Sequence, residues 1–299
     1  MSHAILVSGL INLEVTLRVD GFPIAYAPVH YPFSGIHSTV AGVGYNISKA
    51  LTTLGDRVRL LSLIGQDAAG RAVRQMLESD GLGGEYVLAQ MAQTAHSVIL
   101  YDPSGRRQIY VDLKDVQEQV YPPHLFEGAV DGCDLAVLCN INFSRPFLRR
   151  ARALGRRVAT DVHTIADLED EYNRDFMQYA DILFMSDERL PCPPEEWARA
   201  VQRRYGNEIV VIGLGAEGAL MAVKKDDYLG RIPAARPPRI VNTIGAGDAL
   251  FSAFLHCYLK SGDPYAALRR AVVFAAHKIG SAGAAEGFLD EAALENDMR

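Results

Sequence analysis

A glycine turn that runs into an apolar helix carries one carboxylate at its junction, in the segment Val241-Asn-Thr-Ile-Gly-Ala-Gly-Asp248. Gly245 and Gly247 permit a tight turn whose backbone N–H groups can converge on one small space. The first residues of the helix add unpaired N–H groups and a partial positive charge, which together stabilise an anion. Asp248 would accept a proton from a hydroxyl held beside that anion, as phosphoryl transfer to an alcohol requires. Taken alone, the segment is equally compatible with a loop that ends in an N-cap aspartate.

A second glycine turn lies far upstream, in Ala41-Gly-Val-Gly-Tyr-Asn46, and the helical spacing of the apolar residues after it predicts a helix. A predicted strand and the segment Gly65-Gln-Asp67-Ala-Ala-Gly70 follow it. These segments, in this order and with Gly-Ala-Gly-Asp near the end, resemble the ribokinase (PfkB-type) family of carbohydrate kinases over essentially the whole chain. The resemblance implies an ATP- and Mg²⁺-dependent kinase that phosphorylates a hydroxyl of a small sugar. It also implies that Asp248 is the catalytic base, with Gly245, Ala246 and Gly247 as the anion hole.

The alternation of short apolar runs with amphipathic helices also predicts βαβ units and a mostly parallel sheet. Buried strands are expected at Ala4–Ser8, Val58–Leu63, Leu135–Cys139, Arg157–Asp161, Ile182–Met185 and Glu208–Gly213, with helices such as Pro146–Leu154 and Pro194–Tyr205 between them. Residues 13–40 and 96–113 interrupt this alternation. The resemblance implies that they form a small β-lid over the substrate, on one three-layer α/β/α domain spanning residues 1–299. The apolar lid strands predict a homodimer surface, unless they are edge strands of the main sheet.

Polar residues that follow the first predicted strand are candidates for the substrate site. Asn12 and Glu14 are two residues apart, so their side chains can point the same way into a crevice at the carboxyl end of that strand. The resemblance implies that both contact sugar hydroxyls, with Glu14 where the family usually has aspartate. Asn142 follows another predicted strand and is either a further hydroxyl contact or an ordinary turn asparagine.

The upstream glycine turn supplies two further substrate candidates through the resemblance. Gly42 and Asn46 match the Gly-Gly-x-x-x-Asn sugar-binding turn of the family, with Ala41 in place of the first glycine. The Asn46 amide offers both donors and acceptors to hydroxyl groups. Val43 stands where ribokinases proper often carry lysine, which argues against simple ribokinase activity.

The segment Gly213-Leu-Gly215-Ala-Glu-Gly218 matches the Gly-x-Gly-x-x-Gly dinucleotide fingerprint. However, the next acidic residues come too early to bind a ribose, and no early βαβ unit surrounds the segment. The resemblance instead implies a nucleotide loop in which Gly215 and Gly218 approach ATP, with Gly213 in place of a threonine. Thr243, next to the Asp248 turn, is the third residue assigned to the nucleotide.

Metal binding is predicted at one carboxylate, again through the resemblance. The family often has Asn-x-x-Glu after this strand, holding magnesium through water; in Met185-Ser186-Asp187-Glu188 only Glu188 fits. Mg²⁺ keeps several waters and needs few protein ligands, although an acidic pair at a helix start explains the segment equally well. Asn242 stands where the family usually has aspartate near a monovalent-cation site, so K⁺ is left open as a second cation.

Composition excludes several other classes of protein. The 299 residues carry a net charge of −6, which gives no electrostatic reason to expect a nucleic-acid or membrane partner. No apolar run approaches the roughly 18 residues of a membrane span, and the N-terminal segment lacks the features of a signal peptide. The four cysteines show neither metal-site spacing nor a disulfide framework. We therefore expect a cytoplasmic protein.

Two alternatives to a sugar kinase stay open. The aromatic residues of the predicted lid, Tyr26, Tyr31 and Phe33, would suit a nucleoside, whose base can stack on rings. A nucleoside kinase of the same family is therefore the first alternative. The departures from the family pattern leave a sugar or nucleotide sensor without turnover as the second, against which the intact Gly-Ala-Gly-Asp run argues.

Overall fold

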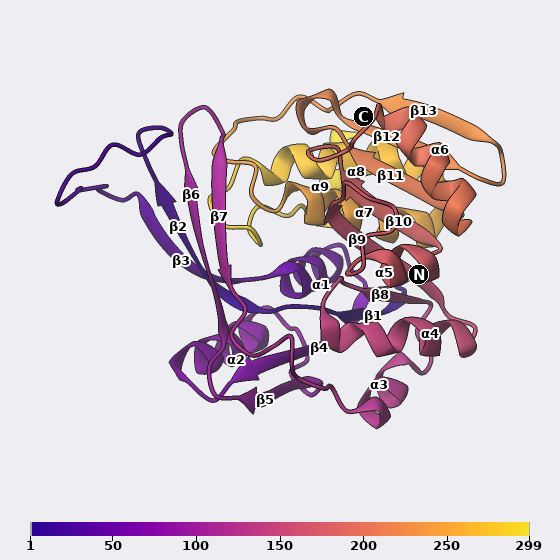
Figure 1. Cartoon of the computed structure of the whole chain (residues 1–299), viewed down its shortest axis with the longest axis horizontal. Helices are drawn as coiled ribbons and strands as arrows, with labels where there is room; N and C mark the ends of the chain where they lie inside the picture. The colour runs from indigo at the N-terminus through magenta and orange to yellow at the C-terminus, as the bar shows by residue number, and fades with distance from the viewer. Residues whose placement is uncertain (1, 299) are drawn as a thin grey trace.

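The computed structural model describes residues 2–298, in which a large sheet lies between two layers of helices and a second sheet projects from its side (Figure 1). Nine strands of this part of the chain form the central sheet, in the order β13-β12-β11-β10-β9-β8-β1-β4-β5. Their bounds are β1 Ala4–Ser8, β4 Arg57–Gly65, β5 Val87–Met91, β8 Leu135–Leu138, β9 Arg157–Thr164, β10 Ile182–Ser186, β11 Ile209–Gly213, β12 Ala219–Val223 and β13 Tyr228–Ile232. Neighbouring strands pair in parallel along β11-β10-β9-β8-β1-β4-β5. Strands β12 and β13 continue the sheet beyond β11 as antiparallel strands. The predicted mostly parallel α/β/α fold is confirmed.

Helices cover both faces of this sheet because its central strands are apolar on both sides. In β1, Ile5 and Val7 pack into one apolar cluster while Ala4 and Leu6 pack into the other. Helices α1 (Val43–Thr53), α2 (Ala68–Ser79), α7 (Ala246–Ser261) and α8 (Pro264–Lys278) contribute to the first cluster. Helices α3 (Pro123–Val130), α4 (Arg145–Ala153), α5 (Arg174–Tyr179) and α6 (Pro194–Tyr205) contribute to the second, and α9 (Glu291–Asp297) contacts α8. Within residues 2–298, no helix combines the length and apolar character that crossing a membrane needs.

The second sheet, called the projecting sheet below, contains four strands of the described chain in the order β3-β2-β6-β7. They are β2 Asn12–Arg18, β3 Ile36–Ala41, β6 Ala95–Tyr101 and β7 Arg107–Asp112, and they stand out from the α/β body in Figure 1. Both segments that interrupt the βα alternation therefore lie in this separate sheet and not at the edge of the main one. Along β2, Asn12, Glu14 and Thr16 are buried, which is unusual for polar side chains that share one face of a strand.

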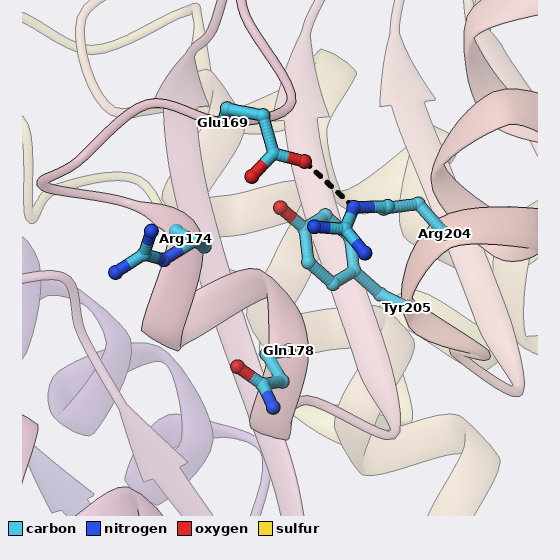
Figure 2. Close-up of a pocket in the computed structure, with 5 residues that line it drawn as sticks. All are labelled: Glu169, Arg174, Gln178, Arg204 and Tyr205. Atoms are coloured by element: carbon cyan, nitrogen blue, oxygen red, sulfur yellow. Dashed lines mark hydrogen bonds and ion pairs between the residues drawn. The ribbon is translucent and has the colours of Figure 1, made fainter.

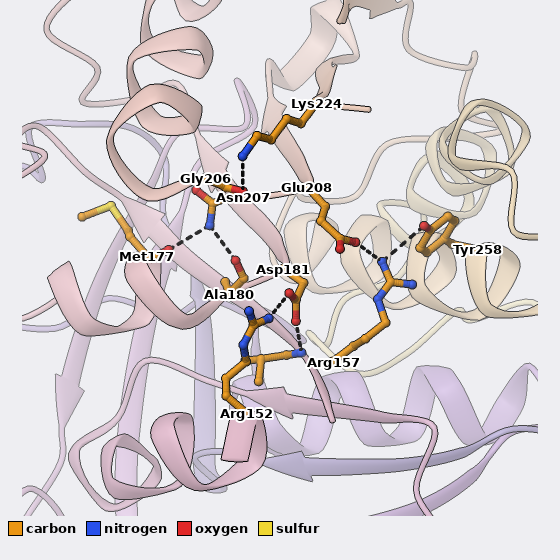
Figure 3. Close-up of polar contacts among 11 residues, drawn as sticks. Arg152, Arg157, Met177, Ala180, Asp181, Gly206, Asn207, Glu208, Lys224 and Tyr258 are labelled. Carbon is orange, nitrogen blue, oxygen red and sulfur yellow. Dashed lines mark hydrogen bonds and ion pairs between the residues drawn. The ribbon is translucent and has the colours of Figure 1, made fainter. Parts of the chain in front are cut away.

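Polar side chains secure the amino ends of β10 and β11 (Figure 3). The Asp181 carboxylate accepts the Val158 N–H at 2.8 Å and contacts Arg152, while Asn207 donates to the Met177 and Ala180 carbonyls at 2.8 and 2.7 Å. Buried side chains here satisfy backbone groups at the amino end of β9 and around the end of α5. In α/β sheets ligands bind at the carboxyl ends of the parallel strands, which here lie at the opposite end of the sheet.

Candidate active site

The glycine turn of the sequence analysis lies at the N-terminus of α7. Gly245 precedes the helix with a φ of 75°, and a Cβ at this position would stand 2.4 Å from the Ala284 carbonyl oxygen, so the site requires glycine. The backbone N–H groups of Gly247 and Asp248 donate to no backbone acceptor in the described part of the chain. The turn therefore presents free N–H groups at the positive end of a 16-residue helix, a donor set suited to an anion.

Asp248 is buried directly beside these groups, with 8% of its surface exposed. Its Oδ2 accepts a hydrogen bond from Nδ2 of Asn46 at 2.7 Å, because α1 and α7 pack against each other. Burial raises the pKa of Asp248 to about 6, against the opposing effects of the Asn46 hydrogen bond and of His163. A carboxylate with a pKa just below neutral is suited to act as a general base.

Three of the predicted substrate residues each have a buried oxygen atom with no hydrogen-bond partner among the described residues: Asn12 Oδ1, Glu14 Oε1 and Asn46 Oδ1. Asn12 donates through Nδ2 to Ser97 Oγ at 2.6 Å, so only its acceptor is free. Burial raises the pKa of Glu14 to about 7, partly offset by the Ala284 N–H and further raised by Asp248. Unpaired buried acceptors are costly, and the hydroxyl groups of a ligand would satisfy them.

The positions of Asn12 and Glu14 differ from the prediction in one respect. Both were expected at the carboxyl end of β1, with Glu14 also inside the lid segment 13–40; both lie on β2 of the projecting sheet. Their side chains still share one face because β2 has a period of two residues. The projecting sheet therefore contributes directly to the group of polar residues around Asp248.

Nothing in the sequence singles out Arg107, which is the first residue of β7. One guanidinium nitrogen donates to Thr243 Oγ1 at 2.6 Å and the other to Glu188 Oε1 at 3.2 Å. The arginine thus joins the tip of the projecting sheet to the Asp248 turn and to the predicted metal ligand. No motif marks Arg107, and only its place directly after a hairpin turn could have drawn attention to it.

Glu188 follows β10 and its side chain is 58% exposed. No group of three or more His, Cys, Asp or Glu side chains suited to a metal occurs within residues 2–298. Because Mg²⁺ commonly uses one or two carboxylates with waters and phosphate oxygens, one exposed carboxylate beside Thr243 fits such an ion.

The two glycines assigned to the nucleotide have different surroundings. The loop joins β11 to the antiparallel strand β12, and no α-helix follows it, so the match to the dinucleotide fingerprint carries no dinucleotide-binding fold. Gly218 has a φ of 99°, and a Cβ there would lie 2.1 Å from the Ile232 carbonyl oxygen. Packing against β13 therefore explains Gly218, whereas Gly215 faces open space.

Two substrate candidates and one surface hollow complete the description. Gly42 precedes α1 as its N-cap. The Asn142 side chain donates to the Gln117 carbonyl at 3.1 Å and accepts from Arg145 at 3.4 Å, so protein groups already satisfy its hydrogen bonds.

The hollow in Figure 2 lies by α5 and α6, on the face of the sheet opposite α7, and is lined by Glu169, Arg174, Gln178, Arg204 and Tyr205. Its Glu169 pairs with Arg204 at 2.7 Å, and it takes no part in the candidate active site.

A buried carboxylate beside free helix N–H groups is an arrangement that suits phosphoryl transfer to an alcohol. Residues 2–292 match the sequence model of the pfkB family carbohydrate kinases, and the chain belongs to this family. The predicted family and its enzymatic class, an ATP-dependent carbohydrate kinase, are thereby confirmed.

Individual relatives agree with this assignment. The chain is 28% identical over 286 residues to an ATP-dependent ribose-1-phosphate kinase from Halopiger xanaduensis, covering 94% of this chain and 93% of the relative. The solved structure of a microbiome-derived acarbose kinase, Mak1, is 27% identical, covers 99% of this chain and 98% of its own, and has a TM-score of 0.88. The ribokinase of Thermotoga maritima has the same fold, with a TM-score of 0.78 at 20% identity over 99% of each chain.

Proposed function

We propose that this kinase transfers the γ-phosphoryl group of ATP to a hydroxyl of a small neutral sugar, with Asp248 as the general base. The observation that supports this most is the burial of Asp248 beside the free N–H groups of the α7 start, with its Oδ2 bonded to Asn46. The acceptor oxygen attacks the γ-phosphorus while its proton passes to Asp248. The bond to the β,γ-bridging oxygen breaks and ADP leaves.

The turn at Gly245, Ala246 and Gly247 would stabilise the charge that develops on the transferred group. The free donors are the Gly247 and Asp248 N–H groups, since the Ala246 N–H already donates to the Thr243 carbonyl at 3.3 Å. The helix start holds these groups in place, so they need no rearrangement during the reaction. Gly42 positions the first turn of α1, from which Asn46 reaches Asp248. Asn46 would then orient both the base and the acceptor hydroxyl.

The unpaired oxygens of Asn12, Glu14 and Asn46 would accept hydrogen bonds from sugar hydroxyls. These acceptors call for the hydroxyl donors of a sugar and not for a phosphate, which would bring mainly further acceptors, so we favour a neutral sugar. Asn142 is a weaker candidate for this site, since its polar atoms have protein partners.

Gly215, Gly218 and Thr243 are the proposed contacts to ATP, with Gly215 the better placed of the two glycines. Glu188 would hold Mg²⁺ through water, and the ion when bound neutralises phosphate charge. Arg107 already contacts Thr243 and Glu188. With nucleotide present, its guanidinium would turn to phosphate oxygens, which it can bind through two parallel hydrogen bonds.

The projecting sheet would act as a lid that excludes water from the transferred phosphoryl group and so suppresses ATP hydrolysis. Five large hydrophobic side chains on its strands are at least 40% exposed: Ile36, Val98, Ile109, Tyr110 and Val111. Exposed apolar strands are commonly covered by a second copy. We therefore propose a homodimer formed through this sheet.

A nucleoside acceptor is the second candidate, and the structure gives it less support. Tyr26, Tyr31 and Phe33 are 92%, 74% and 90% exposed, on the loop between β2 and β3. Tyr31 and Phe33 stack on each other, with their ring centroids 6.2 Å apart, and none of the three rings is part of a buried apolar cluster.

ADP release tests the proposal directly. Mg·ATP would be presented with pentoses, hexoses, deoxysugars, ribose 1-phosphate, acarbose and ribonucleosides, and Asp248→Asn would serve as the control. Turnover on a neutral sugar that is lost in the variant supports the proposal. Turnover only on nucleosides or on sugar phosphates would contradict it, and ligand binding without ADP would indicate a sensor.

A further inference from the structure

Lys278, the last residue of α8, is a lysine with no exposed surface. Its Nζ donates to the Gly283 carbonyl oxygen at 2.8 Å. A Cβ added to Gly245 would lie 3.0 Å from its Cε, so the side chain runs alongside the turn that begins α7. A buried ammonium is costly unless other groups compensate its charge, and a role at this turn would explain its presence.

Three carboxylates partly compensate the charge of Lys278. Glu286, Glu14 and Asp248 all act on it through their charge, while the hydrogen bond of its Nζ goes to the Gly283 carbonyl. Glu286 instead accepts the Gly283 N–H at 2.9 Å. The ammonium therefore stands among the acidic groups of the site while its hydrogen bond goes to a loop carbonyl.

Asn242 also binds the loop that contains Ala282 and Gly283. Its Oδ1 accepts the Ile244 N–H at 3.0 Å, and since a backbone N–H can only donate, the atom facing it must be the oxygen. The amide nitrogen then donates to the Ala282 carbonyl at 2.9 Å. Two successive carbonyls, of Ala282 and Gly283, are thus bonded to N–H donors that belong to the chain itself.

This arrangement does not fit the K⁺ ion that the family resemblance left open beside residue 242. Alkali ions are held by carbonyl and carboxylate oxygens. Here residue 242 is a neutral amide whose oxygen is engaged, both loop carbonyls have donors, and Lys278 already brings a positive charge to the loop.

We propose that Lys278 is a built-in monovalent cation: its ammonium holds the 282–286 loop against the Gly245 turn and supplies the positive charge that a bound alkali ion would otherwise supply. The kinase then works without K⁺. This inference rests on the proposed function, because the turn it supports is the proposed anion hole. Lys278 is a positioning residue, as it reaches the reacting groups only through this turn and through charge.

Two variants separate the charge from the volume of the side chain. Lys278→Ser removes the ammonium and leaves space and a hydroxyl oxygen for an ion, whereas Lys278→Met removes the charge and keeps the space filled. We expect both to lose about 10²-fold in kcat, the scale of one lost electrostatic partner at an anion hole. Added KCl or NH₄Cl should restore Lys278→Ser at least several-fold and leave Lys278→Met unchanged, with tetramethylammonium chloride as the ionic-strength control.

The wild-type enzyme should differ by less than twofold in rate between potassium and tetramethylammonium salts. In parallel, the melting temperature of Lys278→Ser, without substrates, should rise in KCl relative to the control salt, and that of the wild type should not. Activation of the wild type by K⁺, or absence of any K⁺ effect on Lys278→Ser, would overturn the inference. If no acceptor yields ADP, the proposed function fails, while the melting comparison still decides the cation question. Should Lys278→Ser not fold, the potassium response of the wild type decides it.

Discussion

Replacing Asp248 by asparagine should separate catalysis from stability. The substitution keeps the shape of the side chain, and an amide oxygen can still accept from Asn46 Nδ2, which lies 2.7 Å from the carboxylate. It removes the group that takes the proton from the acceptor hydroxyl. Loss of a general base typically costs about 10²- to 10⁴-fold in rate, so we expect Asp248→Asn to lose at least 10²-fold in kcat.

The same substitution should stabilise the protein at alkaline pH. Burial raises the pKa of Asp248 from 3.8 to about 6, so ionising this carboxyl costs roughly 3 kcal/mol more in the folded than in the unfolded chain. The cost is absent below pH 3.8, where both states hold the proton, and it is complete above about pH 6. Asparagine never ionises, so Asp248→Asn should raise the free energy of unfolding by up to about 3 kcal/mol at pH 8 and change it little at pH 4.

Urea unfolding at both pH values, combined with steady-state ADP release, measures both effects. Asp67→Asn is the matched control, because hydrogen bonds from Thr94 and Gly70 outweigh burial and lower the pKa of that carboxyl. It should lose stability at pH 8 and keep its kcat. An Asp248→Asn protein that is destabilised at pH 8 would refute the reasoning about burial. One that retains more than a tenth of the wild-type kcat would refute the role as base.

Four further outcomes are expected. Arg107→Met should lower kcat/KM for ATP by about 10- to 100-fold, the value of a charged hydrogen bond, and an unchanged value would show that the arginine only ties the lid down. Glu188→Gln should raise the Mg²⁺ concentration for half-maximal rate by about tenfold, as seen when one ligand or its support is lost; an unshifted Mg²⁺ titration would exclude this carboxylate. The rate should fall below about pH 6, where Asp248 gains a proton. It should also fall above about pH 8, where Lys278 loses its proton, because burial lowers the pKa of this lysine to about 8. Lys278→Arg should abolish only the fall at alkaline pH. Val111→Asp should give a monomer in light scattering where the wild type is a dimer, and a wild-type monomer would end the dimer proposal.

The central strands could be predicted from the sequence because each is a short apolar run buried on both faces. Leu135–Leu138 shows this, since all four of its residues are buried. The edge strands β12 and β13 were not predicted. Their antiparallel return depends on pairing that continues the sheet from β11, and β13 is half-buried and carries Arg231, so its own residues give a weak strand signal.

The same distinction separates the site residues. Asp248 and its glycines could be found because one contiguous segment contains the turn, the helix start and the base. Arg107 meets Thr243 across 136 residues and Glu188 across 81, so only the arrangement of β7 over the body brings them together. Lys278 was missed for a related reason, since a lysine near the end of a helix is ordinarily a solvated residue.

Glycine spacing illustrates why a motif cannot assign roles residue by residue. Gly215 and Gly218 belong to one Gly-x-x-Gly segment, so the sequence gives no basis for assigning them different roles. Both also have positive φ in the structure. One faces open space and the other is closed in by the end of β13, and only the first can admit a phosphate or ribose without moving the sheet. Substituting alanine should therefore harm folding at Gly218 but nucleotide affinity at Gly215. The pattern identifies the loop, and the packing around each Cα decides which chemistry that position can serve.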